Sequence, residues 1–136
     1  MTALLDVEAL AVILTGAGSR PVGGRLHSAP DRDRLLYAPS HEHNLSFTDE
    51  MARRGPIPQD LRAVSRPEEA AYEADVTCAA TTSKTPLFSD SDLKSGVHIW
   101  GVGSYSLEMQ EIPAETIARA PMVVDSHEMT LAESGD

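Results

Sequence analysis

From Leu35 onward, apolar segments of strand length alternate with segments that carry helix signals. The apolar segments lack a strict apolar–polar alternation, which is typical of strands buried on both faces of a sheet. We therefore predict an α/β fold: a parallel sheet with helices on both faces. The predicted strands lie in RLLYAPS (34–40), DLRAVS (60–65), VTCAATT (76–82), LKSGVHIWGVG (93–103) and PMVVDS (121–126).

Three segments between these strands and one after the last strand carry helix signals. Ser40 is a suitable N-cap for a helix that follows it, with acidic residues early and two arginines last. Ser65 is a suitable cap for a second, short helix with an early proline and acidic first turn, ending near Ala74. Residues 113–119 and 128–136 predict two further helices.

The first 34 residues indicate less order. The stretch ALLDVEALAVIL (3–14) fits either a helix from Asp6 or a short strand, because its apolar run is too short to decide. Two prolines and two glycines in 21–30 exclude a stable helix of useful length there. We therefore divide the chain into residues 1–18, an irregular linker over 19–34, and a domain over 35–136.

The carboxyl ends of three predicted strands are small or hydroxylated. They read Ala38-Pro39-Ser40, Ala80-Thr81-Thr82-Ser83 and Gly101-Val102-Gly103-Ser104. Ligands of parallel sheets bind at the carboxyl ends of the strands, so these ends form a ledge suited to the sugar and phosphates of a dinucleotide. Ordinary Ser/Thr-rich loops have the same composition, and that interpretation stays open.

A phosphate-binding loop is only weakly indicated. The one candidate is Thr15-Gly-Ala-Gly-Ser-Arg-Pro21, which follows an apolar run. Pro21 holds the third position of the motif, and the helix that should follow would run through two glycines, Gly23 and Gly24.

Composition excludes several classes of function. Twenty-one acidic against 11 basic residues give a net charge of −10, which argues against a nucleic-acid partner. Cys78 is the only cysteine, which fits a reducing compartment, and we expect a cytoplasmic protein. No apolar run approaches the ~18 residues of a membrane span, and no signal peptide is indicated. The spacing of the five histidines predicts no metal site.

Three longer stretches carry a family resemblance. RPEEAAYEADVTCAATTSKTPLF (66–88), LKSGVHIWGVGSYSLEMQEIP (93–113) and ARAPMVVDSHEMTLAESGD (118–136) together resemble the ornithine cyclodeaminase/mu-crystallin family. LLYAPSHEHNLSFTDEM (35–51) is similar to the second Rossmann strand and following helix of that family. The resemblance covers 35–136 and implies a partial, Rossmann-like NAD(P)-binding domain.

The first residues resemble the family in a different way. ALLDVEALAVILTGAGS (3–19) is similar to the family's helix before the first Rossmann strand, with Leu14 at the place of an arginine. This alignment implies that the first strand and its glycine fingerprint are missing between Ser19 and Arg34. The alternative keeps Gly16 and Gly18 as a shortened phosphate loop.

The resemblance also implies site residues. Tyr105 stands where ornithine cyclodeaminases have a catalytic aspartate, so the parent activity resembles that of an amino-acid dehydrogenase or imine reductase. NAD and NADP both remain open as cofactor. The implied cofactor-binding residues are Ser40 near the adenine ribose, Ala80, Thr81 and Thr82 along the cofactor, and Val102 and Gly103 near the nicotinamide.

The family's substrate is an amino or imino acid held by a separate domain of a dimer, most of which this chain does not contain. Two alternatives to an enzyme stay open. One is a non-catalytic module that binds a nucleotide or a partner chain. The other is an inactive, truncated remnant, whose unpaired sheet edges and exposed apolar faces predict self-association.

Overall fold

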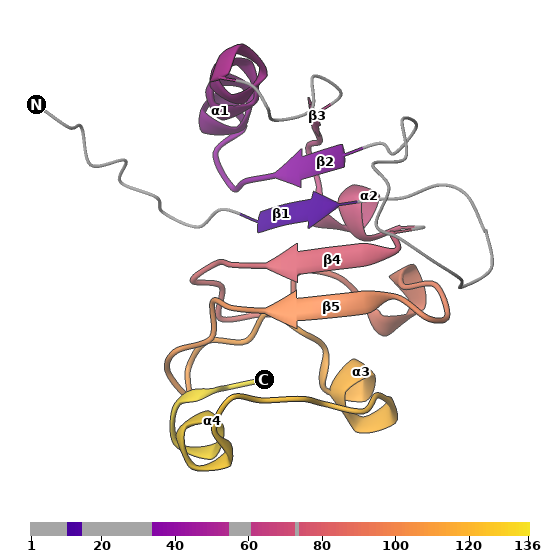
Figure 1. Cartoon of the computed structure of the whole chain (residues 1–136), viewed down its shortest axis with the longest axis vertical. Helices are drawn as coiled ribbons and strands as arrows, with labels where there is room; N and C mark the ends of the chain where they lie inside the picture. The colour runs from indigo at the N-terminus through magenta and orange to yellow at the C-terminus, as the bar shows by residue number, and fades with distance from the viewer. Residues whose placement is uncertain (1–10, 15–33, 55–60, 73) are drawn as a thin grey trace, which may run out of the picture.

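The computed structural model describes residues 11–14, 34–54, 61–72 and 74–136. Its core is a five-stranded sheet in the order β3-β2-β1-β4-β5 (Figure 1). The described strands follow the order of the first five strands of a doubly wound dinucleotide-binding sheet. The strands are β1 (Ala11–Leu14), β2 (Arg34–Tyr37), β3 (Leu61–Ala63), β4 (Val76–Ala79) and β5 (His98–Gly101).

The central strand β1 runs opposite to the other four. β2 pairs with β3 in parallel and β4 pairs with β5 in parallel, whereas β1 is antiparallel to both β2 and β4. In register, Ala11 lies opposite Tyr37 at the end of β2, and Leu14 lies opposite Arg34 at its start. The arrowheads in Figure 1 show β2, β4 and β5 ending at one edge of the sheet and β1 ending at the other.

The predicted parallel sheet is therefore correct for β2, β3, β4 and β5 and differs at β1. The sequence left 3–14 open between helix and short strand, and the described part of it, Ala11–Leu14, is a strand. A four-residue apolar segment can complete the ladders of two parallel neighbours by antiparallel pairing. Such pairing satisfies the backbone of β2 and β4, which would otherwise be unpaired in the middle of the sheet.

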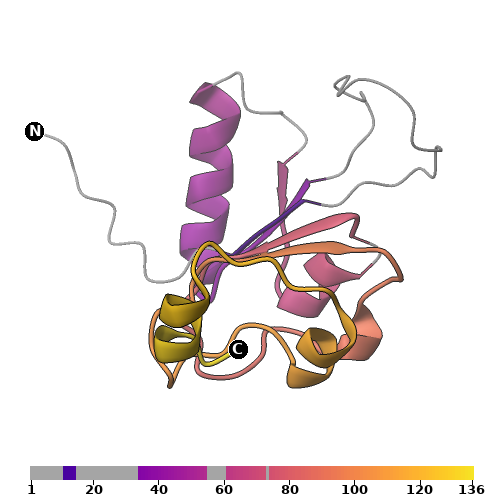
Figure 2. The ribbon, with the colours of Figure 1, turned by 60° about the horizontal axis from the view of Figure 1, so that its bottom comes forward.

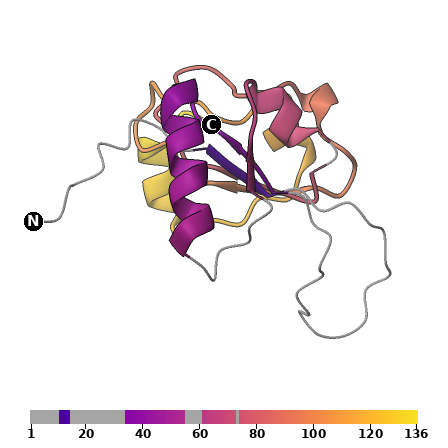
Figure 3. The same cartoon turned by 90° about the horizontal axis from the view of Figure 1, so that it is seen from above.

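Helices cover both faces of the sheet. Figure 3 shows α1 (His41–Arg54) on one side of the strands and α2 (Pro67–Ala71) on the other. The short helices α3 (Ala114–Arg119) and α4 (His127–Glu133) lie past β5 (Figures 1 and 2). These helices confirm all four predicted helical segments, within a few residues at each end.

Ser40 begins α1 as predicted. Its backbone oxygen accepts the first intrahelical bond from the Asn44 nitrogen at 2.9 Å, and its hydroxyl accepts from the His43 nitrogen at 3.3 Å. The cap of α2 differs from the prediction, because Arg66 rather than Ser65 occupies the N-cap position and makes no side-chain cap bond. The proline that follows it already favours the first turn.

Two small groups of buried apolar residues each contain an alanine of α2. Ala70 and Ala74 pack with Leu35 and Val64. The second group contains Ala71, Phe88 and Leu93, with Leu87, Val97 and Ile99 packed against it. Ala70 and Ala71, which are neighbours on α2, thus belong to different groups, one beside Leu35 of β2 and the other beside Ile99 of β5.

The predicted strand over 121–126 is wrong, because the structure has no strand there. The Val123 side chain is 96% exposed. A β-branched apolar segment becomes a strand only when a neighbouring edge accepts its hydrogen bonds, and this segment passes between α3 and α4 instead (Figure 1). Of the described strands, β5 therefore forms one outer edge of the sheet.

No described helix is long and apolar enough to cross a membrane.

Candidate functional site

The predicted ledge lies on the side of the sheet where the carboxyl ends of β2, β4 and β5 are found. These three strands point the same way, so Ser40, Thr81 and Gly103 each follow a strand end on one side of the sheet (Figure 1). The chain leaves β4 at Ala79 and β5 at Gly101, which are paired in register. The Val102 nitrogen then donates to the Ala79 oxygen at 2.8 Å, so the two exits stay adjacent one residue beyond the sheet.

Glu111 joins the two loops that follow β4 and β5. Its side chain is completely buried. One carboxylate oxygen, Oε1, accepts a hydrogen bond from the Thr81 backbone nitrogen, and the other, Oε2, accepts from the Gly103 nitrogen at 2.7 Å. Each oxygen thus holds one loop, and the carboxylate fixes the spacing between them.

Gly103 is required by the close approach of these loops. A Cβ built on Gly103 would collide with the backbone nitrogen and oxygen of Thr81 and with a carboxylate oxygen of Glu111. Any side chain at position 103 would therefore push the two loops apart. A glycine at this place lets its backbone pack directly against the backbone of Thr81.

Asp136 holds the backbone of Glu111 from the other side. Its Oδ1 atom accepts hydrogen bonds from the backbone nitrogens of Glu111 at 2.6 Å and Ile112 at 2.9 Å. The segment before Glu111 is also attached to the loop after β4, because the Gln110 nitrogen donates to the Ser83 oxygen at 2.9 Å. Segments far apart in the chain thus converge under the two strand ends.

The remaining predicted residues on these loops differ in exposure. Thr82 is exposed and Ala80 half-buried, while the Val102 side chain is 66% exposed. Thr81 is buried, and its hydroxyl accepts from the Ser83 nitrogen at 3.1 Å. The buried hydroxyl oxygen of Ser104 has no hydrogen-bond partner within the described ranges. The loops thus present an exposed rim over a buried polar base.

Ser40 lies apart from this pair of loops. It follows β2, which is separated from β4 by β1, so about 10 Å of sheet lies between the two strands. Its hydroxyl is used in the cap of α1. The structure therefore brings Thr81 and Gly103 together through Glu111 and keeps Ser40 on the same edge, across the central strand.

The reversal of β1 changes which end of this strand lies between Ser40 and the Thr81–Gly103 loops. In a parallel sheet the loop after the central strand opens at the carboxyl ends of the strands, where ligands bind. We call this side of the sheet, where β2, β4 and β5 end, the ligand edge. Here Ala11, the first residue of β1, lies at that edge beside Tyr37, and Leu14 lies at the opposite edge beside Arg34 and Val76. The candidate phosphate loop with Gly16 and Gly18 lies outside the described residues.

The comparisons with known proteins agree with this architecture. The model of the ornithine cyclodeaminase/mu-crystallin family matches residues 34–136. The chain belongs to this family. Its membership confirms the resemblance of the sequence stretches 35–51, 66–88, 93–113 and 118–136.

Two relatives with similar sequences are named as reductases. A Delta(1)-pyrroline-2-carboxylate reductase of Bacillus cereus is 32% identical over 133 residues, which is 96% of this chain and 40% of the relative. The ketimine reductase mu-crystallin of Mus musculus is 36% identical over 77 residues, 57% of this chain and 25% of that protein. The chain thus spans about 40% of the length of the bacterial family member.

Solved structures of the family have the same fold. The Delta(1)-pyrroline-2-carboxylate reductase of Thermococcus litoralis, in complex with NADH and L-proline, superposes with a TM-score of 0.68 and 31% identity, over 75% of this chain and 31% of that one. A probable ornithine cyclodeaminase from Bordetella pertussis gives a TM-score of 0.59 with 34% identity, over 67% of this chain and 29% of the other. The α/β, Rossmann-like class is therefore confirmed.

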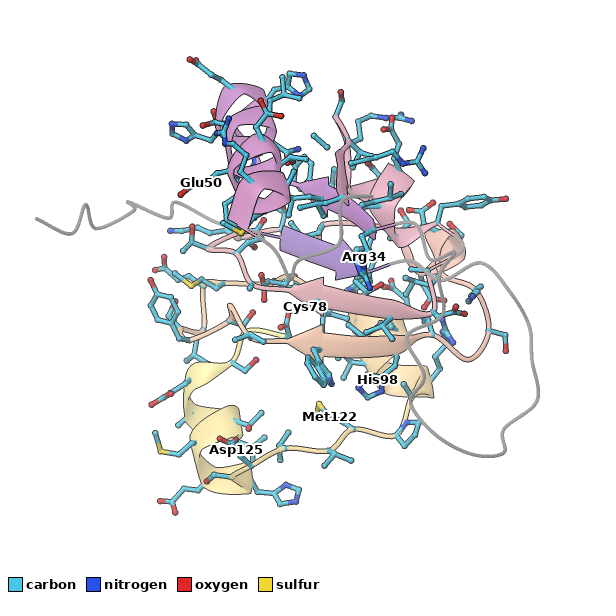
Figure 4. All side chains as sticks on the ribbon, turned by 45° about the horizontal axis from the view of Figure 1, so that its top comes forward. Arg34, Glu50, Cys78, His98, Met122 and Asp125 are labelled. Carbon is cyan, nitrogen blue, oxygen red and sulfur yellow. The ribbon has the colours of Figure 1, made fainter. Side chains whose placement is uncertain are left out.

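The Glu111 carboxylate also acts on the thiol of Cys78. Burial, and then the negative charge of Glu111, raise the pKa of the Cys78 thiol. Cys78 lies on β4 in the middle of the sheet (Figure 4). Within the described ranges, no three His, Cys, Asp or Glu side chains gather as metal ligands would.

Glu111 and Asp136 are the functional candidates that sequence reasoning missed. Both act through backbone nitrogens more than 20 positions away or on another loop, and such contacts leave no local pattern. A signal was nevertheless present. Each acid sits in a short stretch that carried the family resemblance, MQEIP for Glu111 and ESGD for Asp136, and Glu111 is followed by apolar Ile112 and Pro113. An acid before an apolar run that buries is a candidate for backbone binding.

Proposed function

We propose that this chain is the dinucleotide-binding part of an NAD(P)-dependent reductase that acts on cyclic imino acids or related amino acids. The names of its relatives support this class of substrate, since they are reductases of pyrroline carboxylate and of ketimines. A related structure in complex with NADH and L-proline supports the cofactor class. The free Cys78 supports a reducing compartment such as the cytoplasm.

One observation carries the proposal: two adjacent strand ends, tied through the Glu111 carboxylate, meet at the ligand edge of the sheet. The glycine that this meeting requires, Gly103, leaves bare backbone beside Thr81. Because the place of a Cβ on Gly103 is filled by Thr81 and Glu111, the loop carries no side chain of its own at position 103, and a flat aromatic ring can lie over it. The fit to a nicotinamide is therefore good at this end of the ledge.

The residues of this chain divide the cofactor between them. Ala80, Thr81 and Thr82 would lie along the cofactor, with Val102 and Gly103 near the nicotinamide ring. Ser40 at the start of α1 would face the adenine ribose. When bound, the cofactor supplies the hydride for a carbon–nitrogen double bond, and the chain supplies the orientation of the ring face.

Tyr105 favours a reductase over an ornithine cyclodeaminase. It lies two residues past Gly103 and its side chain is 62% exposed. A phenol replaces the carboxylate that the family's cyclodeaminases carry at this place. We assign it no proton transfer; it would border the substrate side of the ring.

Nucleotide binding without turnover is the second candidate. The reversal of β1 favours it, because the described part of the chain supplies no phosphate loop at the ligand edge. The cofactor would then be held by its two ends and less tightly at its pyrophosphate. The two candidates differ in turnover, not in the location of the site.

A melting experiment tests the proposed site. We expect millimolar NADH or NADPH to raise the melting temperature of the chain, because a ligand that binds the native state stabilises it. Val102→Glu should abolish the shift by placing a charge on the rim of the ledge. Leu131→Glu is the matched control, since Leu131 is 82% exposed on α4. A chain that melts cooperatively but responds to neither cofactor would refute the proposal.

A further inference from the structure

The carboxylate of Glu111 is completely buried. In the described part of the chain, no lysine, arginine or histidine pairs with it. A buried charge is costly unless hydrogen bonds compensate it, and the two backbone donors of Thr81 and Gly103 do so here. Its charge therefore remains uncancelled by any described cation, directly under the loops of the ligand edge.

Both loops depend on this one group. The Thr81 nitrogen belongs to the loop after β4 and the Gly103 nitrogen to the loop after β5. Asp136 fixes the backbone of Glu111, and the backbone oxygen of Glu111 accepts a hydrogen bond from the Leu87 nitrogen at 3.0 Å. The carboxylate is thus held firmly and holds two cofactor-facing segments in place.

We propose that Glu111 is the positioning residue of the nicotinamide end, and that its negative charge favours the oxidised, cationic ring over the reduced, neutral one. This inference rests on the proposed function and extends it. The positioning follows from the paired bonds to Thr81 and Gly103. The preference follows from Coulomb attraction, because only the oxidised ring carries a positive charge.

Two substitutions separate the two roles. Glu111→Gln keeps the size of the side chain but removes its charge and turns one acceptor into a donor, which cannot receive a backbone N–H. Glu111→Asp keeps the charge but is one methylene shorter, so it cannot reach both loops. Glu108→Gln is the matched control, because the Glu108 side chain is 76% exposed and pairs only with Lys84 at 2.6 Å among the described residues.

The test measures dissociation constants for NAD⁺ and NADH by titration, together with amide hydrogen exchange at positions 81 and 103. We expect E111Q to weaken both ligands and to shift the affinity ratio toward NADH by about threefold or more. E111D should weaken both ligands with little change in the ratio, and E108Q should change neither. In E111Q, exchange at the amides of Thr81 and Gly103 should accelerate, while in E108Q it should not.

The possible failures are distinguishable. If the unmodified chain binds the cofactors and E111Q lowers both affinities equally, the charge preference is overturned and only a structural role is left. Unchanged affinities in E111Q overturn the positioning role as well. If the unmodified chain binds neither cofactor, the proposed function fails and this inference fails with it.

A variant that does not fold leaves one decisive measurement on the unmodified chain. Its amides at 81 and 103 should exchange slowly and should slow further when NAD⁺ is added. Fast exchange at these two positions would show that the carboxylate does not hold the loops.

Discussion

The side-chain nitrogen of Asn44 donates a hydrogen bond to the backbone oxygen of Leu36 at 3.0 Å, and both residues are completely buried. The same nitrogen donates to the Val64 oxygen at 3.0 Å. One amide on α1 therefore joins the helix to β2 and to the residue that follows β3. This contact sets the position of α1, and with it the position of Ser40 at the ligand edge.

Asn44→Asp should destabilise the chain by about 2 to 3 kcal/mol, because a carboxylate has no N–H to offer the two carbonyl oxygens. Ser46→Ala on the exposed side of the same helix is the control and should stay within about 0.5 kcal/mol of the unmodified chain. Urea unfolding followed by circular dichroism measures both. Equal stability of the two variants would contradict the assigned role of Asn44.

Gly103→Ala should lower the free energy of unfolding by about 1 to 3 kcal/mol, since its methyl group meets the backbone of Thr81, which cannot move without breaking the Glu111 bonds. Gly101→Ala should cost less, because there the Cβ meets the end of the flexible Ile112 side chain at 2.9 Å. Thermal melts of the two variants make the comparison. A larger loss for G101A than for G103A would show that the two loops are not as close as described.

Asp90 should make stability depend on acidity. The Thr116 hydroxyl, and then the Arg119 guanidinium, lower the pKa of Asp90 through hydrogen bonds of 2.7 Å each. A carboxyl whose pKa is lower in the folded state contributes stability above its unfolded pKa of about 3.9, and that contribution is lost as the pH falls through the folded value.

Asp90→Asn should therefore flatten the acid limb of the stability curve below about pH 4. Glu115→Gln, at an exposed position on α3, should leave it unchanged. Urea midpoints at a series of pH values provide the measurement. The prediction fails if D90N and the unmodified chain lose the same stability in acid.

Cys78 should react slowly with alkylating reagents. Its pKa is raised by burial and then by the charge of Glu111, so at mildly alkaline pH less thiolate is present than in the unfolded chain. Mass spectrometry after iodoacetamide treatment should show slower modification in buffer than in urea. The pH–rate profile should shift toward lower pH in Glu111→Gln. An identical profile in that variant would mean that the carboxylate does not reach Cys78.

Self-association is expected at the β5 side of the sheet. Trp100, Met122 and Val123 are 60%, 59% and 96% exposed there, and Met122 lies past His98 in Figure 4. Exposed apolar groups beside a sheet edge favour pairing between chains. Val123→Lys should reduce the apparent mass in concentration-dependent light scattering, and Ala132→Lys on exposed α4 should not. An apparent mass that stays that of a monomer at every concentration would contradict this.

Much of the fold could be predicted because the signals for its helices and strands lie in short stretches of adjacent residues. The cap at Ser40, the early proline of α2 and the apolar runs of β2, β4 and β5 are each contained in a few adjacent residues. The direction of β1 could not be predicted, since four apolar residues carry no mark of which way they run. The strand predicted for PMVVDS (121–126) was wrong for a related reason. The segment has strand propensity, but no described strand pairs with it.

The candidate site divides along the same line. Thr81 and Gly103 could be found because small and hydroxylated residues at strand ends form a recognisable pattern. Glu111 was missed, because its hydrogen bond to Thr81 joins residues 30 positions apart and only its place in a family-like stretch pointed to it. Whether Thr81 and Gly103, or Ser40, Ala80, Thr82 and Val102, touch a cofactor stays a prediction.

The reversed β1 also determines how the sheet can come apart. Among the described strands, hydrogen bonding between the β3–β2 pair and the β4–β5 pair passes through these four residues alone. Release of β1 would leave each parallel pair with its own ladder, as two partly independent opening units. Ser40 would then travel with one unit and the Thr81–Gly103 loops with the other. A ligand long enough to contact both units would hold them together and so oppose the release of β1.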